Sequence, residues 1–153
     1  MERQIKFRGK RFDNGEWVVG DLLHIAGGCL IYFGSDTDTA EPDIEDNSPV
    51  AVELFNDECA VVVPGTIGQF TELFDRTGKN IFEGDILQCP SVPNIPLEVR
   101  YNTLQGAFCL VEHTHTEGAL LGTCPLGEML RHYPDMSVIG NVFDNPSLIS
   151  DKQ

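Results

Sequence analysis

The sequence has no Cys-x-x-Cys pair and no apolar run long enough to cross a membrane. A membrane-spanning helix needs roughly 20 consecutive, mostly apolar residues. The amino-terminal stretch MERQIKFRGKRF is charged and lacks the long apolar segment of a secretory signal. We therefore expect a soluble, intracellular protein.

The arrangement of the cysteines argues against two classes of small protein. The five cysteines are odd in number and scattered singly, as Cys29, Cys59, Cys89, Cys109 and Cys124. This pattern indicates neither a disulfide framework nor a zinc ribbon, so we expect buried, reduced thiols. Motifs for a serine nucleophile elbow, a Walker loop, a Gly-x-Gly-x-x-Gly turn and a His-Glu-x-x-His site are also absent.

Basic residues are missing from one long stretch of the chain. From Phe12 to Asp75 there is no lysine or arginine, while fourteen aspartates and glutamates fall there. The remaining ten acidic residues balance the ten basic ones, so this stretch accounts for the whole net charge of −14. Such a charge repels nucleic acid and attracts basic partners. We expect no direct binding to nucleic acid or to a membrane, and a basic protein as the partner.

The sequence does contain many short apolar stretches separated by turn residues. Asn14-Gly15 between alternating stretches predicts a first hairpin over residues 4–25. The sequence DRTG at residues 75–78 predicts another turn, because aspartate bonds nearby amides and glycine adopts the left-handed conformation. The proline-rich residues 90–96 are predicted to lie outside the strands, because proline cannot donate to a ladder.

One domain over residues 1–153 is expected, because this length is close to the commonest domain size. PLGEMLRH, which begins at Pro125, predicts the single short helix. Many strands with one helix indicate a β-rich barrel or sandwich. Residues 34–49 are acidic and without periodicity, so we predict an exposed loop whose composition is compatible with disorder.

The segment NIFEGDILQC is apolar except for the insert Glu83-Gly84-Asp85. Glycine inside a strand usually marks a bulge, so Gly84 is predicted to kink the strand and let Phe82 and Ile86 both turn inward. Asp85 would then accept hydrogen bonds from amides that lose their ladder partners, and Glu83 would be solvated. A catalytic pair of carboxylates is the alternative interpretation.

Three blocks of sequence resemble the YopX protein family of phages and prophages. They are IKFRGKRFDNGEWVVG, VVPGTIGQFTELFDRTGKNIFEGDIL and SVIGNVFDNP, and together they span nearly the whole chain. The residues that carry these motifs are Gly68, Gln69, Asp75, Gly78, Gly84, Asp85, Gly140 and Asn141. Glu72 departs from the pattern, since glycine is expected there, and the acidic residues 36–58 fall in the variable segment.

The resemblance implies a mainly β fold: a small, partly open barrel of short antiparallel strands with SH3-like elements and one short helix. It also implies an accessory protein of a phage or prophage, located in the cytoplasm of a bacterial host cell. It brings no catalytic residues and no cofactor.

The strongest metal candidate is the segment GAFCLVEHTHTEG. On a strand, His113, His115 and Glu117 would project to one face together with Cys109. The cluster resembles that of a metal-dependent cupin enzyme, but only one residue separates its second histidine from the glutamate, which is too few. Exposed histidines on an edge strand are the alternative. We therefore assign no metal site and keep the cupin-like enzyme as an alternative function.

The acidic run offers a third function, as an inhibitor of a host nucleic-acid-binding protein. Nine carboxylates in the 23 residues from Asp36 to Glu58 lie about 8 Å apart along an extended chain. Duplex DNA carries a charge about every 1.7 Å. The charge density of the acidic run is therefore several-fold too low to imitate DNA, unless folding brings the carboxylates closer together.

The function that we expect first is therefore a non-enzymatic protein-binding module of a phage or prophage. Its partner would be a basic or host-derived protein. Because exposed strand edges pair readily between subunits, a homo-oligomer is a second expectation. Phe108 and most other aromatic residues are expected in the core.

Overall fold

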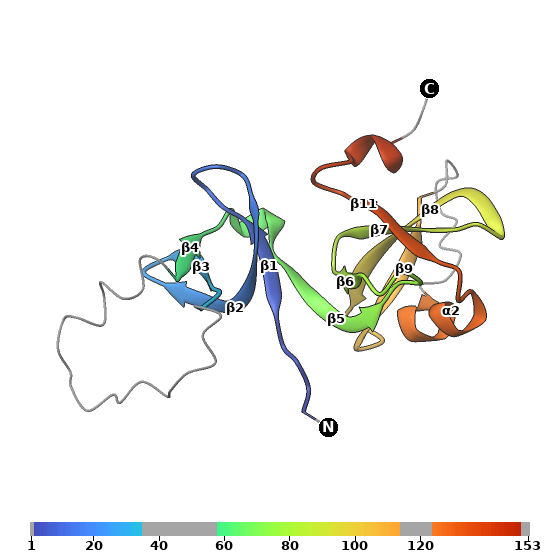
Figure 1. Ribbon diagram of the computed structural model, residues 1–153, viewed down its shortest axis with the longest axis horizontal. Coiled ribbons are helices and arrows are strands. Elements are labelled where there is room, and N and C mark those ends of the chain that lie inside the picture. The colour runs from blue at the N-terminus through green and yellow to red at the C-terminus, as the bar shows by residue number, and fades with distance from the viewer. Residues whose placement is uncertain (1, 35–57, 114–123, 151–153) are drawn as a thin grey trace. The chain divides into compact units, whose positions relative to one another are not determined.

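The computed structural model describes residues 2–34, 58–113 and 124–150 (Figure 1). These residues form eleven β-strands, one α-helix and two short 3-10 helices, so the mainly β class with one short helix is confirmed. The described strands lie in antiparallel sheets that close into no barrel. No described helix is long and apolar enough to cross a membrane.

The chain divides into two compact units, which we describe separately. The N-terminal unit is Ile5–Ile67, and the C-terminal unit consists of Met1–Gln4 and Gly68–Gln153. The single domain over residues 1–153 stays a prediction. Of the predicted acidic loop at 34–49, all but the first residue lies outside the described residues.

The N-terminal unit is an antiparallel sheet in the order β4-β3-β2-β1. Its elements are β1 (Phe7–Lys10), β2 (Trp17–Ile25), β3 (Gly28–Tyr32), β4 (Cys59–Val61) and the 3-10 helix η1 (Pro64–Thr66). The predicted first hairpin is confirmed: Arg8 pairs with Val19, and Gly15 has a φ of 73° in the turn. Positive φ at Ala26 and Gly27 forms the tight turn into β3.

The C-terminal unit combines a hairpin with a five-stranded antiparallel sheet in the order β10-β9-β8-β7-β11. The hairpin is β5 (Gly68–Phe74) and β6 (Asn80–Phe82). The other elements are β7 (Asp85–Cys89), β8 (Val92–Asn102), β9 (Ala107–Glu112), β10 (Cys124–Pro125), α2 (Leu126–His132), β11 (Ser137–Asn141) and the 3-10 helix η2 (Pro146–Leu148).

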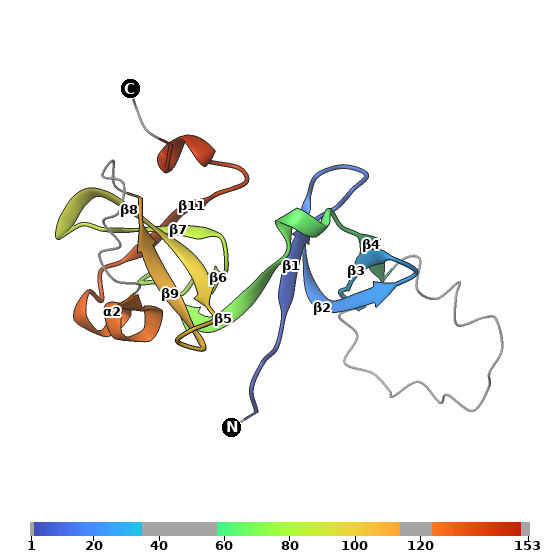
Figure 2. The ribbon, with the colours of Figure 1, turned by 180° about the vertical axis from the view of Figure 1, so that it is seen from behind.

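The core of the C-terminal unit lies between its strands and α2, which packs against β9 and β10 (Figure 1, Figure 2). Ile81, Leu87, Val99 and Met136 are each completely buried there. Leu126 is 1% exposed at the start of α2, as expected of the apolar face of the predicted helix. Burial of this face stabilises a helix that is too short to be stable alone.

The prediction that residues 90–96 lie outside the strands holds for residues 90 and 91 and is wrong for residues 92–96. Strand β8 begins at Val92, which pairs with Cys89. The pairing then shifts register before Leu97 pairs with Leu87. Such a bulge leaves residues of the longer strand without a ladder partner. A bulge therefore accommodates prolines that a regular ladder would exclude.

Candidate functional site

The insert Glu83-Gly84-Asp85 connects two strands that pair with different partners. Phe82 on β6 pairs with Phe70, whereas Ile86 on β7 pairs with Glu98. The predicted single kinked strand is therefore wrong in extent, because the chain passes from the hairpin into the five-stranded sheet at this point. Gly84 has a φ of 89°, which glycine adopts without strain. Its N–H donates to the Val99 carbonyl at 2.8 Å.

Asp85 holds this turn from inside the protein. Its side chain is 2% exposed, and its Oδ2 accepts a hydrogen bond from the Phe82 N–H at 2.7 Å. The flanking Phe82 and Ile86 are both buried. A buried carboxylate is stabilised by such a charge-assisted bond, and the bond fixes the backbone where the ladder stops. The geometry of Asp85 is that of a structural residue.

Asp75 has the same role in the second turn. Its Oδ1 accepts hydrogen bonds from the Thr77 N–H at 2.8 Å, the Thr77 hydroxyl at 2.6 Å and the Lys79 N–H at 3.0 Å. Its Oδ2 accepts from the Val138 N–H at 3.0 Å. Burial raises the pKa of Asp75, but these hydrogen bonds outweigh it and lower the pKa to about 2. Gly78 closes the turn with a φ of 84°.

Three further motif residues, Gly68, Gly140 and Asn141, have structural roles. A Cβ atom at Gly68 would overlap the Glu83 carbonyl oxygen, and one at Gly140 would overlap the Asn145 side chain. Asn141 caps the following turn, since its Oδ1 accepts from the Phe143 N–H at 3.0 Å. These contacts give a structural reason for the residue type at each of the three positions.

The metal candidate is only partly covered by the described residues. His113 Nε2 lies 2.5 Å from Glu98 Oε2, and the same oxygen lies 2.9 Å from Arg100 Nη2. His115 and Glu117 lie outside the described residues. Within the described ranges, no three His, Cys, Asp or Glu side chains are grouped so as to hold a metal ion.

Cys109 is completely buried on β9, where it was expected to share a face with the histidines. Its Sγ contacts Gln105 Oε1 at 3.2 Å. Burial, with a smaller contribution from nearby Cys124, raises the pKa of the Cys109 thiol. The thiol therefore stays protonated at neutral pH, and it is a poor metal ligand or nucleophile.

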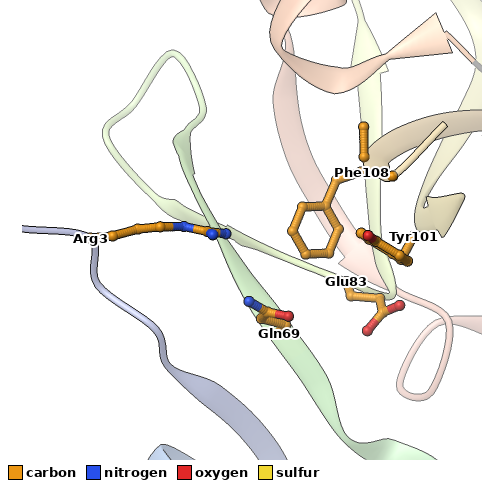
Figure 3. Close-up of a pocket in the computed structure, with 7 residues that line it drawn as sticks. Arg3, Gln69, Glu83, Tyr101 and Phe108 are labelled. Atoms are coloured by element: carbon orange, nitrogen blue, oxygen red, sulfur yellow. The ribbon is translucent and has the colours of Figure 1, made fainter. Parts of the chain in front are cut away.

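A surface hollow of about 490 Å³ in the C-terminal unit was not foreseen from the sequence. Its side-chain walls include Arg3, Gln69, Glu83, Tyr101 and Phe108 (Figure 3). Tyr101 and Phe108 are paired across β8 and β9, and their rings meet edge to face with centroids 5.3 Å apart. Tyr101 is 47% exposed, whereas Phe108 packs partly on the core. The alternation of apolar and polar residues along β8 and β9, on either side of the turn at 102–106, could have revealed the aromatic pair. It could not have revealed the other residues that line the hollow.

Glu72 adjoins this hollow through Arg3. Its backbone φ is 64°, and the register of β5 with β6 shifts between Phe70 and Phe74, on either side of it. Its Oε2 accepts from Arg3 Nε at 2.9 Å, and its Oε1 accepts from the Gln4 N–H at 2.6 Å. The left-handed φ accounts for the glycine that the family resemblance leads one to expect at this position.

Comparison with known proteins gives a family for the chain. The family model described as "YopX protein" matches residues 6–150. No curated protein matches the chain. Among solved structures, the crystal structure of protein EF1440 from Enterococcus faecalis is similar, with 19% sequence identity and a TM-score of 0.48 over 97% of this chain and 100% of that one. The chain belongs to the YopX family.

Proposed function

We propose that the chain is a non-enzymatic protein-binding module of a phage or prophage. It acts in the cytoplasm of the bacterial host cell and binds a basic or host-derived protein. Membership of the YopX family supports the phage origin. The net charge of −14 supports a basic partner, because charge complementarity steers association.

The observation that carries this proposal is the hollow. Its half-exposed Tyr101 stands edge to face with Phe108, and Gln69 and Arg3 supply polar groups around the rings. Aromatic residues are among the side chains that contribute most to protein–protein interfaces, and they do so in small pockets. The hollow has the composition of an anchor point for a partner side chain.

The two buried aspartates support a non-enzymatic role. Asp75, with a pKa of about 2, remains ionised at neutral pH and accepts four hydrogen bonds. A general acid or base works best with a pKa near the operating pH. One carboxylate oxygen of Asp85 accepts a hydrogen bond from the Phe82 N–H. Both aspartates therefore have the properties of residues that stabilise turns, and not of a general acid or base.

Affinity purification from a bacterium that carries the prophage, followed by mass spectrometry, tests the proposal. The wild-type chain should capture a basic protein at low salt and release part of it at high salt. Tyr101→Ala should lose the captured protein. Leu104→Ala is the matched control, because Leu104 is 96% exposed at the tip of the neighbouring turn and does not line the hollow. Equal capture by the wild type and Tyr101→Ala would contradict the assignment of the hollow.

A second copy of the chain is the alternative partner. Strand β4 is last in the order of its sheet in the described residues, and its outer edge is paired at Val61, whose carbonyl accepts the Phe12 N–H at 2.9 Å. The part of β4 before Val61 is therefore the edge that a second copy would extend. Unpaired edge strands can extend a sheet into another subunit. Light scattering at high concentration should then give the mass of a dimer or larger assembly. A monodisperse monomer would contradict this alternative.

A further inference from the structure

Building on the proposed protein-binding role, we propose a docking site for an arginine-bearing, extended segment of the partner protein. The site consists of the Glu72 carboxylate and the hollow that Arg3 lines. Residues 2–4 of the chain occupy it intramolecularly and act as a strap that the partner segment displaces. We call these residues the N-terminal strap.

The contacts of Glu72 show which ligand the site accepts. One carboxylate oxygen pairs with the Arg3 guanidinium at 2.9 Å, and the other accepts the backbone N–H of Gln4 at 2.6 Å. Charge-assisted bonds of this kind are the stronger ones in proteins. The two oxygens of Glu72 together recognise a guanidinium and the backbone N–H of the residue that follows the arginine. A segment with Arg-x, where x is not proline, can repeat both contacts.

The backbone conformation of Glu72 supports a ligand-binding role for its carboxylate. A φ of 64° is a conformation that glycine adopts without strain and that other residues adopt rarely. The chain nevertheless places a glutamate there. Strained residues persist where the surroundings hold them, and they concentrate at ligand-binding sites. Among the contacts of the described residues, those to the N-terminal strap engage both oxygens of this carboxylate.

The strap is held weakly enough to be displaced. The Arg3 side chain is 65% exposed and the Glu72 side chain 32%, so water competes for their ion pair. Exposed ion pairs contribute little stability. The net negative charge of the chain favours the approach of a basic segment. An incoming arginine therefore competes on nearly equal terms with Arg3.

The hollow supplies the rest of the docking surface. Figure 3 shows Arg3 reaching from the N-terminal segment toward Gln69 and the ring of Phe108. Tyr101 completes the aromatic wall. When the strap leaves, these groups can contact the side chains that flank the partner's arginine. The aromatic rings would then contribute apolar contacts, and Gln69 would contribute a hydrogen bond.

A peptide with the sequence ERQIKF, which repeats residues 2–7, is the probe. Its binding to the full chain is measured by fluorescence anisotropy after fluorescein labelling. The Arg3→Ala chain should bind it roughly fivefold more tightly than the wild type, because a weak strap masks most but not all molecules. A peptide with glutamine in place of its arginine should bind neither chain.

Variants of two glutamates separate the docking site from general charge effects. In the Arg3→Ala background, Glu72→Gly should abolish peptide binding while keeping the fold, because glycine suits the local φ. Glu128→Gln removes the same charge from an exposed position in the first turn of α2 and should leave binding unchanged. Thermal unfolding of each variant verifies that it is folded.

Three results would overturn the inference. Equal affinity of the wild-type and Arg3→Ala chains would show that the strap does not occupy the site. Undiminished binding by the folded Glu72→Gly variant would show that Glu72 does not hold the arginine. If the peptide fails to bind but Tyr101→Ala still loses a captured protein, the arginine specificity is wrong and the protein-binding role stands. If no protein is captured at all, the proposed function fails by itself.

Discussion

The turns and the hollow of the C-terminal unit differ in how they use polar side chains. In the turns, Asp75 and Asp85 are buried and accept backbone N–H groups. In the hollow, Arg3 and Tyr101 are largely or half exposed. The two motif aspartates thus stabilise the fold, whereas the hollow, which we propose as the binding surface, combines the motif residue Gln69 with Arg3 and Tyr101. Substitutions should accordingly change stability in the turns and binding in the hollow.

Replacing Asp75 should give the largest loss of stability. Asp75→Ala leaves three backbone N–H groups and the Thr77 hydroxyl without their acceptor. A buried donor without a partner costs about 1–3 kcal/mol, and water can reach part of this turn, so we expect a total loss of about 3 kcal/mol. Urea unfolding of the wild type and the variant measures it. A loss below about 1 kcal/mol would show that the turn does not depend on Asp75.

The low pKa of Asp75 predicts a loss of stability in acid. Its folded pKa of about 2 lies below the ordinary value of 3.8, so the folded state favours the ionised form. This contribution is fully present above pH 4 and is lost as the pH falls toward 2. The difference corresponds to about 2 kcal/mol. Unfolding free energies measured from pH 5 to pH 2 should therefore fall by about that much more for the wild type than for Asp75→Asn. Parallel curves for the two proteins would contradict the assignment.

Gly84 should tolerate a side chain poorly because of its conformation. With a φ of 89°, Gly84→Ala should lose about 1–2 kcal/mol of stability. Gly65→Ala is the control, because a Cβ atom there meets nothing within 4 Å and the backbone is outside the left-handed region. Thermal unfolding should show a lower midpoint for the first variant and an unchanged or higher one for the second. A reversal of that order would remove the structural explanation for the Glu83-Gly84-Asp85 insert.

Tyr101→Ala should have the smallest effect on stability of these substitutions. Tyr101 is half exposed, and its edge-to-face contact with Phe108 contributes about 1 kcal/mol. The unfolding free energy should fall by about that amount, while the capture of a partner protein is lost. A loss of several kcal/mol would place Tyr101 with the structural residues and weaken the distinction between turns and hollow.

Local sequence chemistry predicted those parts of the fold that depend on neighbouring residues. Asn14-Gly15, the turn at 75–78 and the helix after Pro125 all follow from the preferences of a few adjacent side chains. The class of fold followed from the number of such turns. The family could be predicted as well, because its motifs are short and lie in order along the chain.

The features that the sequence could not reveal depend on long-range pairing. The segment around Gly84 has the pattern of one strand, and only the partners Phe70 and Glu98 show that it is two. The hollow brings Arg3 from the N-terminus together with residues of β5, β8 and β9. Its residues carry no common motif, because the contacts that join them depend on the register of the sheet.

The most direct test compares Asp75→Asn and Tyr101→Ala in the same affinity purification, at a temperature at which both variants are folded. The account predicts that Asp75→Asn captures the partner protein as the wild type does, although it is less stable, and that Tyr101→Ala captures none. Capture by Tyr101→Ala together with loss by a folded Asp75→Asn would contradict it, because the binding site would then lie at the turns.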